Sequence, residues 1–387
     1  MDIFEKCYNY TAPDKVKEAG LYPYFHSLQS KQDVEVVMEG KRRIMLGSNN
    51  YLGLTAVPEI MEAGIKAIED YGTGCSGSRI LNGTFDFHLE LEKELSDFLR
   101  QEDTMTFSTG FQANLGVIAG LLNKNDYVIC DRENHASIYD GCRLGYGKML
   151  RYKHSDMEDL EKKLILAEDH AKLIITDGVF SMSGDIANLP EIIRLAKKYD
   201  ARVMVDDAHG LGVLGDGGRG TASYFDLEKE VDIYVGTFSK SLASLGGYVS
   251  AKKSIINYLK HNSRPFIFSA SIPPSNGIVA LESLRYIRKH PERIERLHAL
   301  VRYTKNEMKQ AGLNIIESNV PIIPIYTYTF ENTLIKSKKI YDAGVYVNNV
   351  IPPAAPEGQC LLRTSLMANH TEELIKEAVE IIAKELS

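Results

Sequence analysis

The chain has 387 residues, of which 44% are hydrophobic and 25% charged, as in ordinary globular proteins with a large buried core. A net charge of −7 argues against a basic face for nucleic acid and gives no general attraction to an anionic membrane. The chain lacks an apolar run of about 18 residues and a secretion signal at its start, so we expect a cytoplasmic protein without a stable membrane anchor.

The first 45 residues predict an N-terminal arm that ends in two short strands. Segments 34–38 and 43–46 are rich in apolar and β-branched residues and flank a glycine-containing turn. Apolar residues then recur with helical spacing over 57–71 and over 87–100, which predicts two amphipathic helices.

An alternation of strands and helices follows. The predicted strands are 104–107, 127–130, 173–176, 202–205 and 233–236. Long helical stretches separate several of them, which is typical of a mostly parallel sheet with helices on its faces. Segment 247–250 is expected to add an antiparallel strand.

The pattern changes after about residue 285. A long charged helix over 291–311 precedes short strands at 322–328 and 361–364 and a final helix at 371–386, which predicts a smaller α+β domain. The predicted division is therefore an arm (1–45), a large cofactor-binding domain (46–285) and a small C-terminal domain (286–387).

Lys240 follows a predicted strand and lies among small hydroxylated residues in Val235-Gly-Thr-Phe-Ser-Lys-Ser241. An aldehyde cofactor with a phosphate tail needs an amine for a Schiff base and hydroxyls for the phosphate. We therefore predict that Lys240 binds pyridoxal phosphate (PLP), with Thr237 and Ser239 as phosphate ligands. Ser-Lys-Ser is also a common string on exposed loops, and Ser239 has the alternative of capping a turn.

A second polar cluster, Asp206-Asp-Ala-His-Gly210, follows the predicted strand 202–205. Ligands of open α/β sheets bind at the carboxyl ends of strands. An ionised Asp206 there could pair with a protonated pyridine nitrogen, and His209 could hydrogen-bond the ring phenolate. Both aspartates have the alternative of capping the next turn, which we favour for Asp207 only.

Gly110 and Phe111 follow a predicted strand and open a helix, so their free backbone N–H groups suit a phosphate. His135 lies just past another strand, where an imidazole could stack on the pyridine ring, although a lone histidine is more often structural. Gly210-Leu-Gly-Val-Leu-Gly215 matches a dinucleotide fingerprint by letter, but its surroundings predict a loop rather than the start of a helix.

The five cysteines are scattered and form no Cys-x-x-Cys pair, which indicates free thiols in a reducing compartment. Cys75 lies in a glycine-rich loop and is more simply interpreted as a small buried residue than as a chemical group. The histidines are too dispersed to form a local cluster, so we expect no metal site.

Nearly end to end, the chain resembles the α-oxoamine synthases, a family of fold-type I PLP-dependent transferases. The segments that carry the resemblance are 47–54, 71–84, 108–114, 131–140, 177–185, 205–212 and 236–247. It implies an α/β fold with a mostly parallel seven-stranded sheet, helices on both faces and a smaller C-terminal α+β domain. It also implies PLP as cofactor and a homodimer with shared active sites.

The resemblance gives four residues catalytic roles. Lys240 would carry the internal aldimine, Asp206 would pair with the pyridine nitrogen, and His209 would contact the ring oxygen. His135 would stack on the ring and help to hold the substrate carboxylate.

The resemblance also implies residues that bind the substrate and residues that act across the dimer. Asn49 and Arg363 lie at positions that contact the amino-acid carboxylate. Ser269 and Ala270 would reach the PLP phosphate of the partner subunit, and Ser78 would approach the substrate of the partner subunit.

Within this family the chain is most similar to bacterial members that condense L-serine with a long-chain acyl thioester, palmitoyl-CoA, at the first step of sphingolipid synthesis. The product expected is 3-ketodihydrosphingosine. Members that use glycine, alanine or cysteate stay open as alternatives (glycine C-acetyltransferase, 8-amino-7-oxononanoate synthase, cysteate acyltransferase), as does acyl carrier protein in place of CoA. A catalytically silent subunit would lack Lys240, and a PLP lyase or aldolase would need no thioester.

Overall fold

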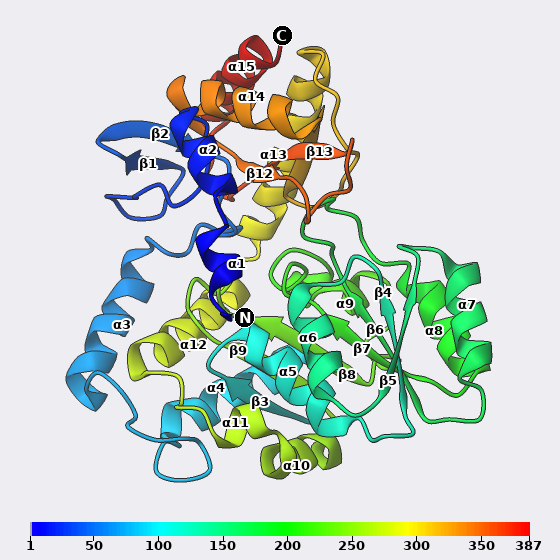
Figure 1. Cartoon of the computed structure of the whole chain (residues 1–387). Coiled ribbons are helices and arrows are strands. Elements are labelled where there is room, and N and C mark those ends of the chain that lie inside the picture. The colour runs from blue at the N-terminus through cyan, green and yellow to red at the C-terminus, as the bar shows by residue number, and fades with distance from the viewer. Residues whose placement is uncertain (1) are drawn as a thin grey trace.

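A seven-stranded sheet forms the centre of the molecule in a computed structural model that describes residues 2–387 (Figure 1). Its strand order is β3 (Asp103–Phe107), β9 (Gly247–Ala251), β8 (Ile233–Thr237), β7 (Arg202–Asp206), β6 (Lys172–Asp177), β4 (Tyr127–Asp131) and β5 (Lys148–Tyr152). All neighbours are parallel except β9, which runs antiparallel to both β3 and β8. The mostly parallel sheet with an antiparallel β9 is therefore confirmed.

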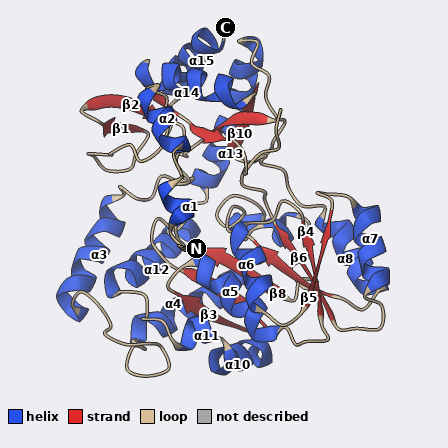
Figure 2. Cartoon of the chain, in the orientation of Figure 1, coloured by secondary structure: helices blue, strands red, loops and turns tan. Residues whose placement is uncertain are grey.

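Both faces of this sheet are buried, because successive side chains of its strands enter different apolar clusters. Val203 and Val205 of β7 join one cluster, and Met204 between them joins the other. The helices that pack in the cluster of Met204 include α5 (Gly110–Leu121), α6 (Ala136–Leu144), α10 (Lys253–Asn262) and α11 (Arg264–Ile267). The helices that pack in the cluster of Val203 and Val205 include α4 (Asp86–Leu99), α7 (Met157–Leu166) and α8 (Leu189–Lys198), so helices flank the sheet on both sides (Figure 2).

A second lobe lies above the sheet in Figure 1 and is built from both ends of the chain. It contains β10 (Ile322–Tyr328), β13 (Cys360–Ser365) and β12 (Asn348–Val350) in one antiparallel sheet. Three helices belong to the same lobe: α13 (Glu292–Gln310), α14 (Phe330–Asp342) and α15 (Glu372–Leu386). The predicted arm strands, β1 (Glu35–Met38) and β2 (Lys41–Met45), extend this lobe because β2 pairs with β11 (Val345–Tyr346). The predicted domain boundaries stay a prediction.

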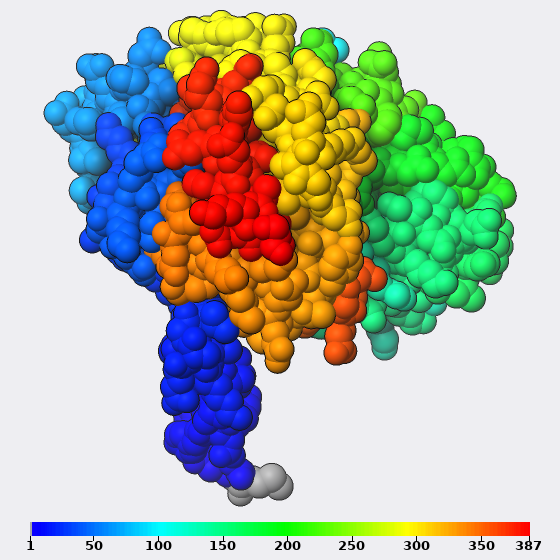
Figure 3. All heavy atoms as spheres, turned by 90° about the horizontal axis from the view of Figure 1, so that it is seen from above, coloured from blue at the N-terminus to red at the C-terminus, as the bar shows by residue number. Residues whose placement is uncertain are grey.

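Several further elements complete the structure. They are α1 (Glu5–Tyr8), α2 (Ala12–Glu18), α3 (Pro58–Tyr71), the 3₁₀ turn Asp216–Gly218, α9 (Thr221–Tyr224) and α12 (Pro274–Lys289). Neither α1 nor α2 has a buried residue, and this N-terminal segment projects from the body of the molecule (Figure 3). Among the helices of residues 2–387, none is both long and apolar enough to cross a membrane.

Candidate active site

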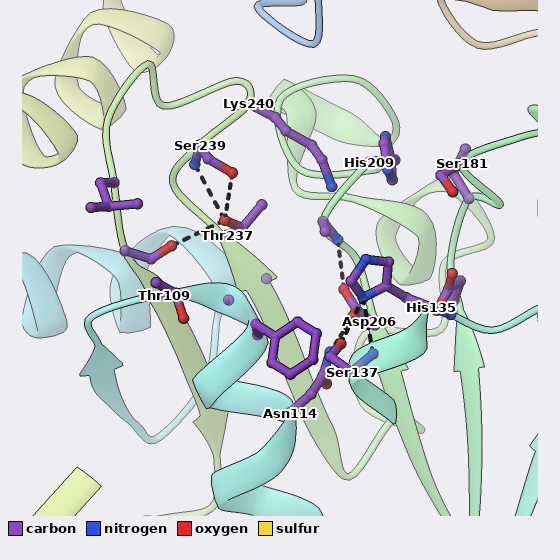
Figure 4. A pocket seen from close by; sticks show the side chains of 18 residues that line it. Thr109, Asn114, His135, Ser137, Ser181, Asp206, His209, Thr237, Ser239 and Lys240 are labelled. Atoms are coloured by element: carbon purple, nitrogen blue, oxygen red, sulfur yellow. Dashed lines mark hydrogen bonds between the residues drawn. The ribbon is translucent and has the colours of Figure 1, made fainter. Parts of the chain in front are cut away.

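A cavity of about 300 Å³ lies at the carboxyl ends of the parallel strands, where ligands of such sheets bind. Its lining includes eight of the predicted site residues: Gly110, Phe111, His135, Asp206, His209, Thr237, Ser239 and Lys240. They come together because β8, β7, β6 and β4 are consecutive parallel strands whose carboxyl ends meet at one edge of the sheet. Figure 4 shows Thr109, Thr237 and Ser239 on one side of this cavity and His135, Asp206 and His209 on the other.

Lys240 enters the cavity from the loop that follows β8, and its amine points between the two groups (Figure 4). Removal from water lowers the pKa of Lys240 to about 8, although the nearby carboxylates of Asp206 and Asp177 oppose this effect. At pH 7 about one tenth of this amine is therefore uncharged, far more than for an ordinary lysine. An uncharged amine can attack an aldehyde or accept a proton.

Asp206 is the last residue of β7 and is held from two directions. Asn114 Nδ2 in α5 donates to Asp206 Oδ2 at 2.6 Å, and the backbone N–H of Ala208 donates to Asp206 Oδ1 at 3.1 Å. Hydrogen bonds that donors give to a carboxylate favour its ionised form. The arrangement suits a partner for a protonated ring nitrogen, which is the role predicted for Asp206.

Asp177, at the end of β6, also lines the cavity, although we did not predict it from the sequence. Burial and the neighbouring charge of Asp206 raise the pKa of Asp177 well above its usual range. Asp177 Oδ1 accepts the backbone N–H of His135 at 3.4 Å. Asp177 therefore fixes the start of the loop that presents His135.

The two cavity histidines are both held through their Nδ1 atoms. His135 Nδ1 lies 2.7 Å from Ser137 Oγ and 3.3 Å from the Ser137 backbone N, at the start of α6. His209 Nδ1 lies 2.6 Å from the hydroxyl of Tyr51. Burial lowers the pKa of each imidazole, and for His209 the charges of Lys240 and Arg363 add to the effect. Both rings are therefore neutral at physiological pH.

The other end of the cavity fits the phosphate of the predicted cofactor. Gly110 begins the 12-residue helix α5, and a Cβ atom at this position would lie 2.8 Å from Thr237 Cβ. Glycine thus lets the start of α5, with its free backbone N–H groups, lie close to Thr237 at this end of the cavity. The hydroxyls of Thr237 and Ser239, 2.9 Å apart, face the same space. Together with Lys240 and Asp206, these groups fit a molecule that carries an aldehyde, a basic ring nitrogen and a phosphate.

Asn49 and Arg363 lie behind the cavity lining, next to each other. Arg363 Nη2 donates to Asn49 Oδ1 at 3.0 Å and to Tyr51 Oη at 3.2 Å. Arg363 Nε also donates to the backbone carbonyl of Ser181, which lines the cavity. The structure thus brings this predicted pair together and connects it to His209 through Tyr51.

Ser78, Ser269 and Ala270 form a separate group outside the lining of the cavity. Ser78 and Ala270 pair in an isolated antiparallel bridge, and Ser269 Oγ accepts from Gln112 Nε2 at 3.2 Å. The Ser108 hydroxyl donates to the carbonyl of Ala270. These contacts hold the two segments together at the surface, beside the exposed ring of Phe268.

Comparisons with known proteins agree with this geometry. The family "Aminotransferase class I and II" matches residues 41–382. Serine palmitoyltransferase of Bacteroides thetaiotaomicron is 51% identical over 381 residues, covering 98% of this chain and 97% of that protein. The 8-amino-7-oxononanoate synthase of Thermosipho melanesiensis is 43% identical and covers 96% and 95%.

Solved structures show the same fold. A structure of SPT with the PLP internal aldimine has a TM-score of 0.96 and 38% identity, covering 100% of this chain and 98% of that one. The serine palmitoyltransferase of Sphingomonas wittichii has a TM-score of 0.94 and 35% identity, with coverage of 100% and 98%.

Proposed function

The chain belongs to the aminotransferase class I and II family and, within it, to the α-oxoamine synthases, and from this premise we propose that it is a serine C-palmitoyltransferase. It condenses L-serine with palmitoyl-CoA and releases CO₂ and free CoA. The product is 3-ketodihydrosphingosine. The observation that carries this proposal is a lysine of lowered pKa in one cavity with an aspartate that accepts two hydrogen bonds, in a chain 51% identical to a serine palmitoyltransferase over nearly its whole length.

Lys240 and Asp206 perform the central proton chemistry. Bound PLP supplies an electron sink for the charge that develops on the amino-acid Cα. The Lys240 amine, with a pKa of about 8, accepts the Cα proton. Asp206 would hold a proton on the ring nitrogen of bound PLP, because its carboxylate is fixed in place by hydrogen bonds from Asn114 and the Ala208 N–H. Gly110, Thr237 and Ser239 bind the phosphate.

Arg363, with Asn49 and His135, orients the serine carboxylate. A guanidinium can fix the rotation of a carboxylate through N–H···O bonds. Arg363 already donates to Ser181, Ser365, Asn49 and Tyr51, which leaves one N–H on Nη1 for the substrate. Loss of CO₂ requires the bond from Cα to the carboxylate to stand perpendicular to the cofactor ring. Arg363 is 5% exposed and tied to Asn49, Tyr51 and Ser181, so its position is well defined before substrate arrives.

The proposal is tested by incubating purified protein and PLP with palmitoyl-CoA and, separately, serine, glycine, alanine or cysteate. We expect free thiol and CO₂ to appear in equal amounts with serine. A Lys240→Ala variant should lose this activity, and a Lys124→Ala variant, which changes an exposed lysine far along the chain, should keep it. Thiol release with glycine, alanine or cysteate but without serine would contradict the proposed substrate.

A second candidate is 8-amino-7-oxononanoate synthase, favoured by the 43% identity to the Thermosipho melanesiensis protein. As a sibling of this family it would use glycine, alanine or cysteate in place of serine. The panel of amino acids in the same assay distinguishes the candidates.

We also propose that the protein acts as a homodimer with shared active sites. Supporting this, Ser78, Ser269 and Ala270 lie together outside the lining of the chain's own cavity. Phe268 beside them is 74% exposed, and the projecting N-terminal segment exposes further large apolar side chains, among them Tyr8. Light scattering coupled to gel filtration should give about twice the 43.3 kDa chain mass, and a monomer that retains full activity would contradict the proposal.

We also propose a cytoplasmic location, on the evidence of the cysteines. All five cysteines are free, and Cys130 and Cys142 remain unbonded with their sulfurs 3.7 Å apart. Such a pair stays reduced most readily in a reducing compartment. Cell fractionation with an antibody to the protein tests this location.

A further inference from the structure

A buried chain of hydrogen bonds connects Arg363 to His209 through the hydroxyl of Tyr51. Arg363 Nη2 lies 3.2 Å from Tyr51 Oη, and Tyr51 Oη lies 2.6 Å from His209 Nδ1. The Tyr51 side chain is fully buried, with 0% exposure. Its hydroxyl therefore lies between a residue proposed to bind the substrate carboxylate and a residue proposed to bind the cofactor ring.

The direction of these hydrogen bonds follows from the donors available. An arginine can only donate, so Tyr51 Oη accepts from Arg363. Burial raises the pKa of Tyr51, so the phenol keeps its single proton. That proton has two possible acceptors, Asn49 Oδ1 at 3.3 Å and His209 Nδ1 at 2.6 Å. Asn49 Oδ1 already accepts from Arg363 Nη2 at 3.0 Å, so the shorter contact to His209 takes the tyrosine proton.

We propose that Tyr51 is a positioning residue that holds His209 in the tautomer with its ring proton on Nε2. In this tautomer Nδ1 accepts from Tyr51, and Nε2–H is free to donate to the ring oxygen of the bound cofactor. The inference rests on the proposed function, because it assigns the ring oxygen of PLP to His209. It adds a residue to the site and states which nitrogen of His209 carries the proton.

The tautomer matters because His209 is neutral. Burial, followed by the charges of Lys240 and Arg363, lowers the pKa of His209 well below its usual range. A neutral imidazole donates from one nitrogen and accepts at the other. With the proton on Nδ1, the Nε2 lone pair would face an electron-rich oxygen and repel it. Tyr51 thus converts a buried imidazole into a donor, and Arg363 fixes the orientation of Tyr51.

Nitrogen NMR of protein labelled with ¹⁵N-histidine tests the tautomer directly, with and without PLP. The His209 signals are identified as those lost in a His209→Asn variant. In the wild-type protein without PLP we expect a neutral ring protonated on Nε2. In Tyr51→Phe, which removes only the hydroxyl, we expect the His209 signals to move toward the Nδ1–H form or to average between the two.

Tyr152→Phe is the matched control, because Tyr152 is also fully buried and, within residues 2–387, its hydroxyl makes no hydrogen bond to His209. It should leave the His209 signals unchanged. Asn49→Ala, which removes the competing acceptor, should also leave the ring protonated on Nε2. Wild-type signals of an Nδ1–H ring, or signals that Tyr51→Phe does not move, would overturn the proposal.

Kinetics give a second readout. Tyr51→Phe should weaken the hydrogen bond that His209 would donate to the charged ring oxygen of the cofactor. We therefore expect kcat for the condensation to fall by about tenfold and the KM for palmitoyl-CoA to stay unchanged. A general loss of folding would change both constants and the melting temperature. The NMR result does not require condensation activity, so failure of this inference and failure of the proposed function are distinguishable.

Discussion

Two clusters of buried charge lie close to the central sheet, and they are built differently. In the first, Arg79 donates from Nη1 and Nη2 to the two carboxylate oxygens of Glu92, at 2.6 and 3.1 Å. The backbone N–H and the hydroxyl of Thr106 donate to the same carboxylate at 2.9 and 3.0 Å. The side chains of Arg79 and Glu92 are 7% and 5% exposed, so both charges are withdrawn from water and fully paired.

The second cluster surrounds Lys240 and leaves its charge without a partner. Within residues 2–387, Lys240 Nζ makes no hydrogen bond and no ion pair, and its pKa falls to about 8. The pKa of Asp177 is raised well above its usual range by burial and by Asp206. Both clusters bury ionisable groups, but in the cavity cluster burial shifts the pKa of Lys240 toward neutral pH. Partners that stabilise a charge completely leave it no capacity for chemistry, and this cluster keeps that capacity at a cost in stability.

Replacing Lys240 should cause the largest loss of activity but no loss of stability. We expect Lys240→Met to lower kcat by about 10³-fold or more, because the general base is lost. Without PLP, the free energy of unfolding should stay the same or rise, because an unpaired buried amine is replaced by an apolar chain. Activity assays and urea unfolding of the PLP-free protein measure the two quantities. A large loss of stability would show that Lys240 is paired in solution.

Replacing Arg79 should instead lower the free energy of unfolding. Arg79→Met leaves the Glu92 carboxylate buried without its cation, which costs about 3–5 kcal/mol for a buried ion pair. The same urea experiment measures this loss. Arg285→Met is a control, because Arg285 also pairs with carboxylates but is 30% exposed, and it should cost about 1 kcal/mol or less. Equal losses for both variants would remove the distinction between the clusters.

The difference between the two clusters also explains what the sequence could predict. Lys240, Asp206, His209 and His135 each lie at or just after the end of a strand, and the ends of parallel strands meet at one edge, so their convergence was predictable. Asn114 was not, because its contact with Asp206 joins residues 92 positions apart and depends on how α5 packs.

The fold was predictable to a similar extent. The apolar strands at the centre of the sheet were found, but β5 was not predicted as a strand, because Lys148-Met-Leu-Arg-Tyr152 is an edge strand in which only Tyr152 is fully buried and there is no long apolar run. The pairing of β2 with β11 joins residues 301 positions apart, Ile44 and Val345, and nothing in either segment specifies the other. Tyr51 resembles any core tyrosine in sequence and acquires its role only from Arg363 and His209.

In a third cluster, around His154, replacing the histidine should cause an intermediate loss of stability that depends on pH. Burial opposes a charge on His154, but hydrogen bonds to Asp131 and Asp185 raise its pKa from 6.5 to about 10. A pKa raised on folding gives stability that is fully present below pH 6.5 and is lost as the pH rises through about 10. His154→Gln should therefore cost about 2 kcal/mol at pH 6, less than a fully buried pair, and progressively less toward pH 10.

Urea unfolding at several pH values measures this cost, with His261→Gln on the exposed side of α10 as the control. The control should show a small difference that does not vary with pH in this way. A cost for His154→Gln that is constant from pH 6 to pH 10 would mean that the imidazole is uncharged.

The smallest expected effect is the pH dependence of cofactor capture, and it tests the shifted pKa of Lys240 most directly. Only the uncharged amine attacks an aldehyde, so the rate at which PLP-free protein binds PLP should rise about tenfold per pH unit below the pKa and level off above about 8. Asp206→Asn removes a charge that raises this pKa, so the midpoint should move to lower pH. Stopped-flow absorbance of PLP measures both profiles. A wild-type midpoint near 10.5, the ordinary value for lysine, would mean that Lys240 is as well solvated or paired as a surface amine, and the contrast with the Arg79 cluster would disappear.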